Sequence, residues 1–240
     1  MLTKRLESVT SAVLISFQRR YIMEIEVKYQ LPGTDILNAI WNSEDLFKIS
    51  VHGTSEAVPM KALYYDTADR SLRKSGLTLR VRSEGSEAFC TMKWGGAVIK
   101  GVHEREEVNI PVSIKDAYLV PDESVLSRFP RGAEVLKAAE QSPLIPLIIM
   151  EFTRMRRRLV YDGNVMELAL DSGKIIAGED SCDILEMELE HYDGRDPLSV
   201  LELGEIIADK YRLELQPKSK YARGLALLKH QSSSADPSRL

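Results

Sequence analysis

Acidic and basic side chains recur at every second position in short runs of this sequence that are otherwise apolar. In the first such run, Glu24, Glu26 and Lys28 alternate with Ile25 and Val27. Successive side chains of a β-strand point to opposite faces, so this run would place its three charges on one face. Carboxylates bind hard divalent cations, and lysine and arginine form charge-assisted hydrogen bonds with phosphate. Such a face has the chemistry of a site for metal ions and a polyanion.

The same spacing recurs along the chain, with acidic residues mainly in the first and last runs and basic residues mainly between them. The residues that would share a strand face are Arg80 with Arg82, Thr91 with Lys93, Arg105 with Glu107, Arg154 with Arg156 and Arg158, Glu167 with Asp171, and Glu186 with Glu188 and Glu190. A single strand of this kind is ordinarily the solvated side of a half-buried antiparallel sheet. The repetition favours one shared functional face.

The alternation predicts eight strands, at residues 23–30, 60–65, 77–83, 88–94, 102–110, 150–160, 165–170 and 184–191. Eight is a natural number of strands for a closed barrel. The faces opposite the charges are apolar, as at Leu79 and Val81, so we expect helices to cover them. Charges inside a barrel are costly as pure structure, but they suit a lumen that holds a polyanion and metal ions. The predicted fold is α+β, an eight-stranded antiparallel β-barrel, or tunnel, with helices packed outside.

Helices are expected in the segments between these strands. They are predicted at residues 34–49, in parts of 114–140, at 197–211 and at 219–229. The third begins with Asp196 as a candidate N-cap and Pro197 at the first helical position. The domain is expected to span residues 23–230, between a disordered extension at 1–22 and a disordered tail at 231–240.

Composition excludes several classes of protein. There are 32 Lys and Arg against 36 Asp and Glu, a formal net charge of −4, so the chain has no overall polycationic surface for duplex nucleic acid. No apolar run is long enough to cross a bilayer, so no membrane association is expected. The two cysteines, Cys90 and Cys182, form no zinc-binding or disulfide pattern, which favours a cytoplasmic location.

The order of the motifs resembles that of the CYTH domain, the superfamily of triphosphate tunnel metalloenzymes. Residues 24–28 match its opening E-x-E-x-K signature, and residues 64–67, 77–82, 91–93, 103–107, 167–173, 186–190 and 219–224 resemble the segments that follow in that family. The resemblance covers residues 23–229. It is closest to the bacterial inorganic triphosphatase branch, without the helical CHAD domain that some members carry.

The resemblance implies a role for each matched position. The implied metal ligands are Glu24, Glu26, Glu186 and Glu188, and the implied catalytic residues are Lys28 and Glu107. The implied substrate-binding residues are Lys28, Arg80, Arg82, Lys93, Arg105, Arg154, Arg156, Lys220 and Arg223. The roles of Glu167, Asp171 and Glu190 stay open. An all-oxygen set of ligands favours two Mg²⁺ or Mn²⁺ ions over zinc.

The function that follows is metal-dependent hydrolysis of inorganic tripolyphosphate to pyrophosphate and phosphate. Three alternatives remain open: a class IV type adenylate cyclase, a thiamine triphosphatase that stacks its substrate on Trp41 or Trp94, and a non-catalytic polyphosphate-binding module. The expected partner is a small-molecule triphosphate, and the chain is expected to be a monomer or a homodimer.

Overall fold

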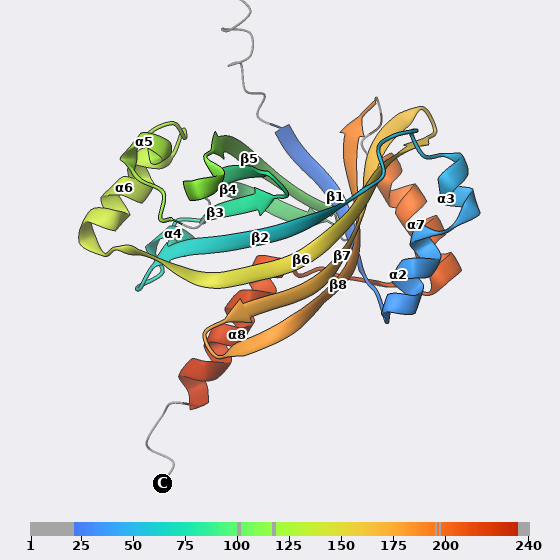
Figure 1. Cartoon of the computed structure of the whole chain (residues 1–240). Coiled ribbons are helices and arrows are strands. Elements are labelled where there is room, and N and C mark those ends of the chain that lie inside the picture. Colours follow the sequence, from blue (N-terminus) through green and yellow to red (C-terminus); the bar gives the residue numbers. More distant parts are fainter. Residues whose placement is uncertain (1–21, 100–101, 117–118, 195, 197, 235–240) are drawn as a thin grey trace, which may run out of the picture.

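The computed structural model describes residues 22–99, 102–116, 119–194, 196 and 198–234. Side chains are described for residues 25–95, 106–115, 119–194, 196 and 198–228. Within these ranges, nine antiparallel strands form one sheet in the order β5-β4-β3-β2-β6-β7-β8-β1-β9 (Figure 1). The strands are β1 (Ile22–Gln30), β2 (Glu56–Thr67), β3 (Leu77–Glu84), β4 (Glu87–Ile99), β5 (Val102–Val112), β6 (Leu144–Tyr161), β7 (Asn164–Ala177), β8 (Asp180–Asp193) and β9 (Glu214–Leu215).

The predicted α+β class with a large antiparallel sheet is confirmed. Each of the eight predicted strands is present, and most extend further at their ends than the alternation indicated. The ninth strand, β9, has two residues and pairs with Tyr29 and Gln30 of β1. Two residues are too few to show the alternation of side chains that marks a strand, so the sequence could not predict it.

A tight turn fixes the register of the two strands that carry much of the charge. Tyr161 and Asn164 are partners at the ends of β6 and β7, and Asp162 and Gly163 between them both have positive φ, at 46° and 72°. Two such residues are typical of the type I′ turns that match the twist of a hairpin. The register that follows places Arg154 opposite Asp171.

Strand β1 connects the two sides of the sheet, but it does so in two halves. Residues Ile22 to Val27 pair with β5, and residues Glu26 to Gln30 pair with β8. β1 has nine residues whereas β8 has 14, so β1 cannot pair along the whole length of β8. The described sheet is strongly curved (Figure 1), and its two edges meet only through these two halves of β1, so it is not fully closed into the predicted barrel.

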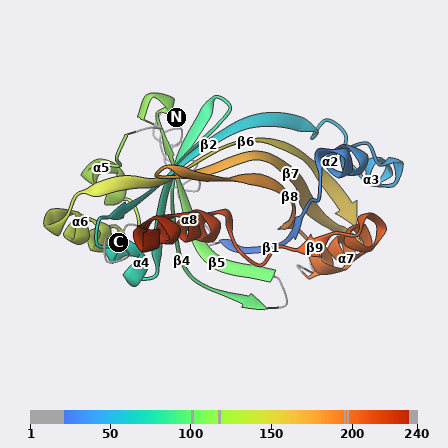
Figure 2. The same cartoon turned by 90° about the horizontal axis from the view of Figure 1, so that it is seen from below.

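Most helices cover the outer, apolar face of the sheet, as predicted. The helices are α2 (Thr34–Trp41), α3 (Glu44–Lys48), α4 (Ser71–Lys74), α5 (Glu123–Leu126), α6 (Gly132–Gln141), α7 (Ser199–Tyr211) and α8 (Lys220–Ser234), with a 3-10 turn, η1 (Ile114–Asp116). Helices α5 and α6 lie at one end of the sheet, and α2, α3 and α7 lie at the other (Figures 1 and 2). Leu203 and Ile207 of α7 pack with Val27 and Leu189 in one core cluster. Each such fully buried aliphatic side chain contributes about 1.5 to 3 kcal/mol.

Helix α8 corrects the prediction that every helix packs outside. Its Leu225 is buried with Ile148, Ile175 and Ile184 of β6, β7 and β8. By strand parity these three residues share the face that carries Arg154, Asp171 and Glu188, so α8 covers the charged face of the sheet. A Cβ atom on Gly224 would lie 2.7 Å from Cγ2 of Ile148, so any larger residue would force Ile148 or α8 to shift.

Three predicted helices differ from the structure in their bounds. The helix predicted at residues 34–49 is two helices, α2 and α3, separated at residues 42–43. Helix α7 begins at Ser199 rather than at Pro197, and Asp196 instead accepts hydrogen bonds at its side chain from the Leu198 N–H and at its carbonyl from Ser199. Helix α8 continues to Ser234, into the segment expected to be a tail, while residues 1–21 and 235–240 lie outside the described residues. No described helix is long and apolar enough to span a bilayer.

Candidate active site

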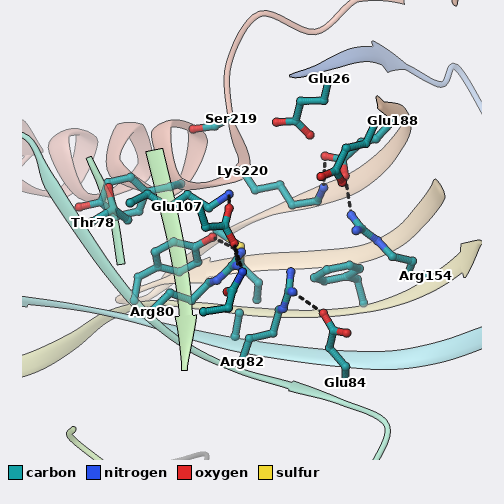
Figure 3. Close-up of a pocket in the computed structure, with 18 of the residues that line it drawn as sticks. Glu26, Thr78, Arg80, Arg82, Glu84, Glu107, Arg154, Glu188, Ser219 and Lys220 are labelled. Carbon is teal, nitrogen blue, oxygen red and sulfur yellow. Dashed lines mark hydrogen bonds and ion pairs between the residues drawn. The ribbon is translucent and has the colours of Figure 1, made fainter. Parts of the chain in front are cut away.

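The charged face of the sheet borders a cavity of about 470 Å³, a volume typical of small-molecule sites. Figure 3 shows labelled side chains from β1, β3, β5, β6 and β8 and from the start of α8 pointing toward one another around it. The alternation of charged and apolar residues therefore correctly indicated that charged residues of distant strands share one face. One part of this wall is basic, and a cluster of carboxylates lies beside it.

The basic part of the wall comes from the central strands. Arg80 and Arg82 of β3, Lys93 of β4, and Arg154 and Arg156 of β6 all line the cavity. Neighbouring carboxylates hold several of these cations: Arg82 contacts Glu84, and Arg156 donates to Glu56 across 2.8 Å and lies 3.7 Å from Glu84. Clustered, partly buried cations of this kind are suited to binding a ligand with several negative charges.

Beside the basic part lies a cluster of three buried carboxylates, Asp171, Glu186 and Glu188, which we call the acidic trio; Glu188 lines the cavity, whereas Asp171 and Glu186 are fully buried next to it. Asp171 and Glu186 are register partners on β7 and β8, and Glu188 lies two residues further along β8 on the same face. One oxygen from each residue lies within 4.8 Å of the others, a spacing compatible with one shared cation. Glu186 and Glu188 were predicted metal ligands; Asp171, whose role the sequence left open, joins them.

Three cations, Lys220, Arg154 and Arg223, make the shortest contacts with the acidic trio. Nζ of Lys220 lies 2.7 Å from Asp171 and 2.9 Å from Glu188, and it also contacts Glu186. Arg154 pairs with Asp171 and Glu188. Arg223 donates to Glu186 across 2.6 Å and to the carbonyl of Asp183, which places it behind Glu186 rather than among the described residues of the cavity wall.

The opening motif reaches the same cavity through Glu26 and Lys28 of β1. The two side chains contact each other, and Nζ of Lys28 lies 3.6 Å from Glu188. Glu26 pairs across the sheet with Glu190 on one side and with His103 on the other. The side chains of two further predicted residues, Glu24 and Arg105, lie outside those described, and their backbones are register partners on β1 and β5.

Glu107 of β5 lies within the basic part of the wall. It contacts Lys93, and its Oε1 lies 3.8 Å from Arg80 and accepts a hydrogen bond from Asn109 across 2.7 Å. Asn109 also accepts from the hydroxyl of Thr91 at 2.6 Å. The amide of Asn109 thus holds the Glu107 carboxylate beside Lys93 and Arg80.

The CYTH domain sequence profile matches residues 23–225. The chain belongs to the CYTH domain family. Among curated proteins, the inorganic triphosphatase of Haemophilus influenzae is 35% identical over 131 residues, which is 55% of this chain and 35% of that protein. The match therefore spans about one third of the length of that relative.

Solved structures share the fold of the CYTH domain at low sequence identity. HpAC1 of Hippeastrum, named as a candidate adenylyl cyclase and reported to have a dominant triphosphatase activity, is 21% identical, with a TM-score of 0.62 over 85% of this chain and 96% of that one. The PH1819 protein of Pyrococcus horikoshii is 17% identical, with a TM-score of 0.50 over 86% and 99% of the two chains. These likenesses show the fold.

The CYTH cavity also contains residues that the sequence analysis did not assign to the site. Thr78 and Glu84 line it because they lie on the same face of β3 as Arg80 and Arg82. The predicted strand ended at residue 83, one residue before Glu84. Tyr64 and Tyr221 line it as a stacked pair, with ring centroids 5.0 Å apart. No strand pattern could have joined Tyr64 of β2 to Tyr221, which lies on α8 and is distant in sequence.

Burial and charge shift the pKa values of several groups in this CYTH cavity. Burial would raise the pKa of Glu188, but Lys220, Lys28 and Arg154 outweigh it and hold that pKa well below its ordinary value. Burial likewise opposes the charge of Arg154, yet Asp171 and Glu188 raise its pKa. Burial also disfavours ionised Tyr64, and Arg80 nevertheless lowers its pKa. In the contact between Glu188 and Arg154, the ionised forms of both groups are therefore favoured side by side.

Proposed function

We propose that this chain hydrolyses an inorganic triphosphate, tripolyphosphate, to pyrophosphate and phosphate with the help of divalent cations. The observation that carries the proposal is a cavity with a basic wall that borders the acidic trio through Glu188. The basic wall supplies charge-assisted hydrogen bonds to a polyphosphate, and the trio supplies oxygen ligands for a metal. The name of the Haemophilus influenzae relative supports the same reaction.

The donor set fits Mg²⁺ or Mn²⁺, and we propose that two ions take part. All side-chain donors of the trio are carboxylate oxygens, which hard cations prefer. Asp171, Glu186 and Glu188 would hold one ion, and Glu26, together with the Glu24 of the sequence prediction, would contribute to the second. Metal ions at such a site neutralise phosphate oxygens and lower the pKa of a bound water.

The chain's own side chains would then position the substrate. Arg80, Arg82 and Lys93 would bind phosphoryl oxygens from one side of the cavity, and Arg154 and Arg156 from another, which fixes the polyphosphate by several contacts at once. Phosphoryl transfer depends mostly on such positioning and charge stabilisation. Lys28 would donate to a phosphate oxygen, and Glu107 would keep Lys93 and Arg80 oriented toward the substrate.

We further propose that the sheet encloses this substrate as the tunnel of the family. The pairing of β1 with β8 and also with β5 supports this proposal, because β1 lies between the two sides of the curved sheet. Helix α8 contributes Lys220 and Tyr221 to the cavity wall and would limit access from its side.

The test is a substrate panel of tripolyphosphate, pyrophosphate, ATP and thiamine triphosphate, each with Mg²⁺ and with Mn²⁺. Released phosphate and cyclic nucleotide are measured separately. We expect the highest kcat/KM for tripolyphosphate. Without metal we expect no release of phosphate. Cyclic AMP as the main product would instead identify a cyclase, and preference for thiamine triphosphate would identify the organic substrate. Of the described residues that line the cavity none is a tryptophan, so the structure offers no Trp41 or Trp94 stacking platform there.

A further inference from the structure

Lys220 occupies the position within the acidic trio that a metal ion would take. Its Nζ contacts all three carboxylates, at 2.7 Å from Asp171, 2.9 Å from Glu188 and in a shorter contact with Glu186. The same three carboxylates have oxygens within 4.8 Å of one another. The ammonium group and a shared cation would therefore use the same oxygens.

Among the described side chains in contact around the trio, the charges are balanced before any metal binds. Four carboxylates, Glu26 and the trio, face four cations, which are Lys28, Arg154, Lys220 and Arg223. A divalent cation added to this set would leave an excess of two positive charges. Repulsion between an ammonium group and a divalent cation a few ångströms apart is large inside a protein, so both cannot remain among the trio's oxygens.

Lys220 is also the residue best placed to leave. It is the first residue of α8 and follows the loop that contains Pro217, whereas Arg154 lies in the middle of the 18-residue strand β6 with paired strands on both sides. Arg154 additionally makes two hydrogen bonds to Asp171. The start of α8 lines the cavity through Ser219, Lys220 and Tyr221, so a displaced Lys220 would turn toward the space where a polyphosphate binds.

From this geometry we infer that Lys220 is a built-in competitor of the divalent cation, held by the acidic trio until metal binding transfers it to the substrate phosphates. The inference rests on the proposed function for the nature of the substrate, but the competition itself concerns metal binding alone. Because linkage is reciprocal, a polyanion that attracts Lys220 would strengthen metal binding, and metal would strengthen polyanion binding by the same factor. The trio would then bind metal weakly without substrate and tightly with it.

The first experiment measures Mn²⁺ affinity by electron paramagnetic resonance in the absence of any phosphate. Lys220→Gln should bind Mn²⁺ about tenfold more tightly than the wild type, because one positive charge has left the trio. Lys220→Arg should retain the weak binding. Lys210→Gln is the matched control, because Lys210 forms an ion pair of the same 2.7 Å length with Asp45 on the surface. It should bind Mn²⁺ as the wild type does.

The second experiment uses the wild-type chain and does not depend on the folding of a variant. Lysines are acetylated briefly with and without Mn²⁺, and the modified positions are quantified by mass spectrometry. Labelling of Lys220 should rise severalfold with Mn²⁺, while labelling of Lys210 should not change. The inference would be overturned if wild type and Lys220→Gln bound Mn²⁺ with equal affinity or if neither bound it. It would also be overturned if labelling of Lys220 did not change with Mn²⁺.

These outcomes are separable from failure of the proposed function. Metal-dependent hydrolysis of tripolyphosphate with an unchanged Mn²⁺ affinity in Lys220→Gln would refute the competition alone. Tighter Mn²⁺ binding in Lys220→Gln by a chain that hydrolyses no triphosphate would support the competition and refute the hydrolase.

Discussion

Arg154 and Asp171 are joined by two parallel hydrogen bonds, from Nε to Oδ1 at 2.8 Å and from Nη2 to Oδ2 at 2.7 Å. The two residues are register partners on β6 and β7, and Asp171 is fully buried. A bidentate arginine–carboxylate pair fixes geometry as well as charge. This pair holds one carboxylate of the acidic trio in place, at the border between the trio and the basic part of the cavity wall.

Loss of this pair should be costly for stability. Arg154→Ala would leave Asp171 and Glu188 buried with one cation fewer, and breaking a buried ion pair typically costs about 3 kcal/mol or more. We expect the free energy of unfolding, measured by urea denaturation, to fall by about that amount. Arg73→Ala, at an exposed position outside the cavity, should change it by less than about 0.5 kcal/mol. Equal effects of the two substitutions would contradict the buried role of Arg154.

The carboxylates of the opening motif should be needed for turnover. Glu26→Gln keeps the shape of the side chain but removes a charge that a metal ion would use, so we expect phosphate release from tripolyphosphate to fall on the order of a hundredfold. Glu24→Gln should behave in the same way. The control is Glu151→Gln, because Glu151 is 51% exposed and pairs with Lys61 at 2.6 Å on the surface. Near wild-type activity of both Glu24→Gln and Glu26→Gln at saturating metal would refute their role.

The basic wall should distinguish three phosphoryl groups from two. Pyrophosphate would leave some of the cations of β3, β4 and β6 without a phosphate partner. Each charge-assisted contact contributes roughly 1.5 to 3 kcal/mol, so the loss of two should lower kcat/KM by on the order of a hundredfold or more. Arg156→Ala should depress kcat/KM for tripolyphosphate, whereas Arg73→Ala should not. Comparable kcat/KM values for the two substrates would show that the wall does not recognise a triphosphate.

Two carboxylates of the cavity should affect stability in opposite directions with pH. The pKa of Glu188 lies well below its ordinary value of 4.5, because its cations outweigh burial. The ionised form therefore stabilises the fold above pH 4.5, and this contribution is lost as pH falls from there through the lowered pKa. Burial raises the pKa of Glu167 above 4.5, although Arg156 and Arg154 oppose it, so ionised Glu167 destabilises the fold at neutral pH.

The corresponding variants should separate these two contributions. At neutral pH, Glu188→Gln should lower the free energy of unfolding and Glu167→Gln should raise it, as measured by urea denaturation. Both differences should shrink in acid, where the carboxylates become protonated, but the difference for Glu167→Gln should shrink at the higher pH. The same sign for both variants at neutral pH would be inconsistent with these shifts.

Local properties of the sequence determined which residues face the cavity. Charged side chains at every second position, such as Arg80 and Arg82, must share a face once the segment is extended, whatever the rest of the chain does. The same parity assigned the apolar outer faces that α2 and α7 cover. The order of the motifs was enough to indicate the CYTH family, which the profile match over residues 23–225 confirms.

Contacts between distant segments were decided by the tertiary structure. The register of the β6–β7 hairpin placed Arg154 opposite Asp171, and packing of α8 on the charged face brought Lys220 into the acidic trio. The residues next to Lys220 and Asp171 in the sequence do not distinguish them from charged residues on a surface. The alternation of side chains alone therefore left the role of Asp171 open. The partners of a buried charge depend on which strands and helices pack together, because a charge can be buried at moderate cost only where that packing supplies an opposite charge.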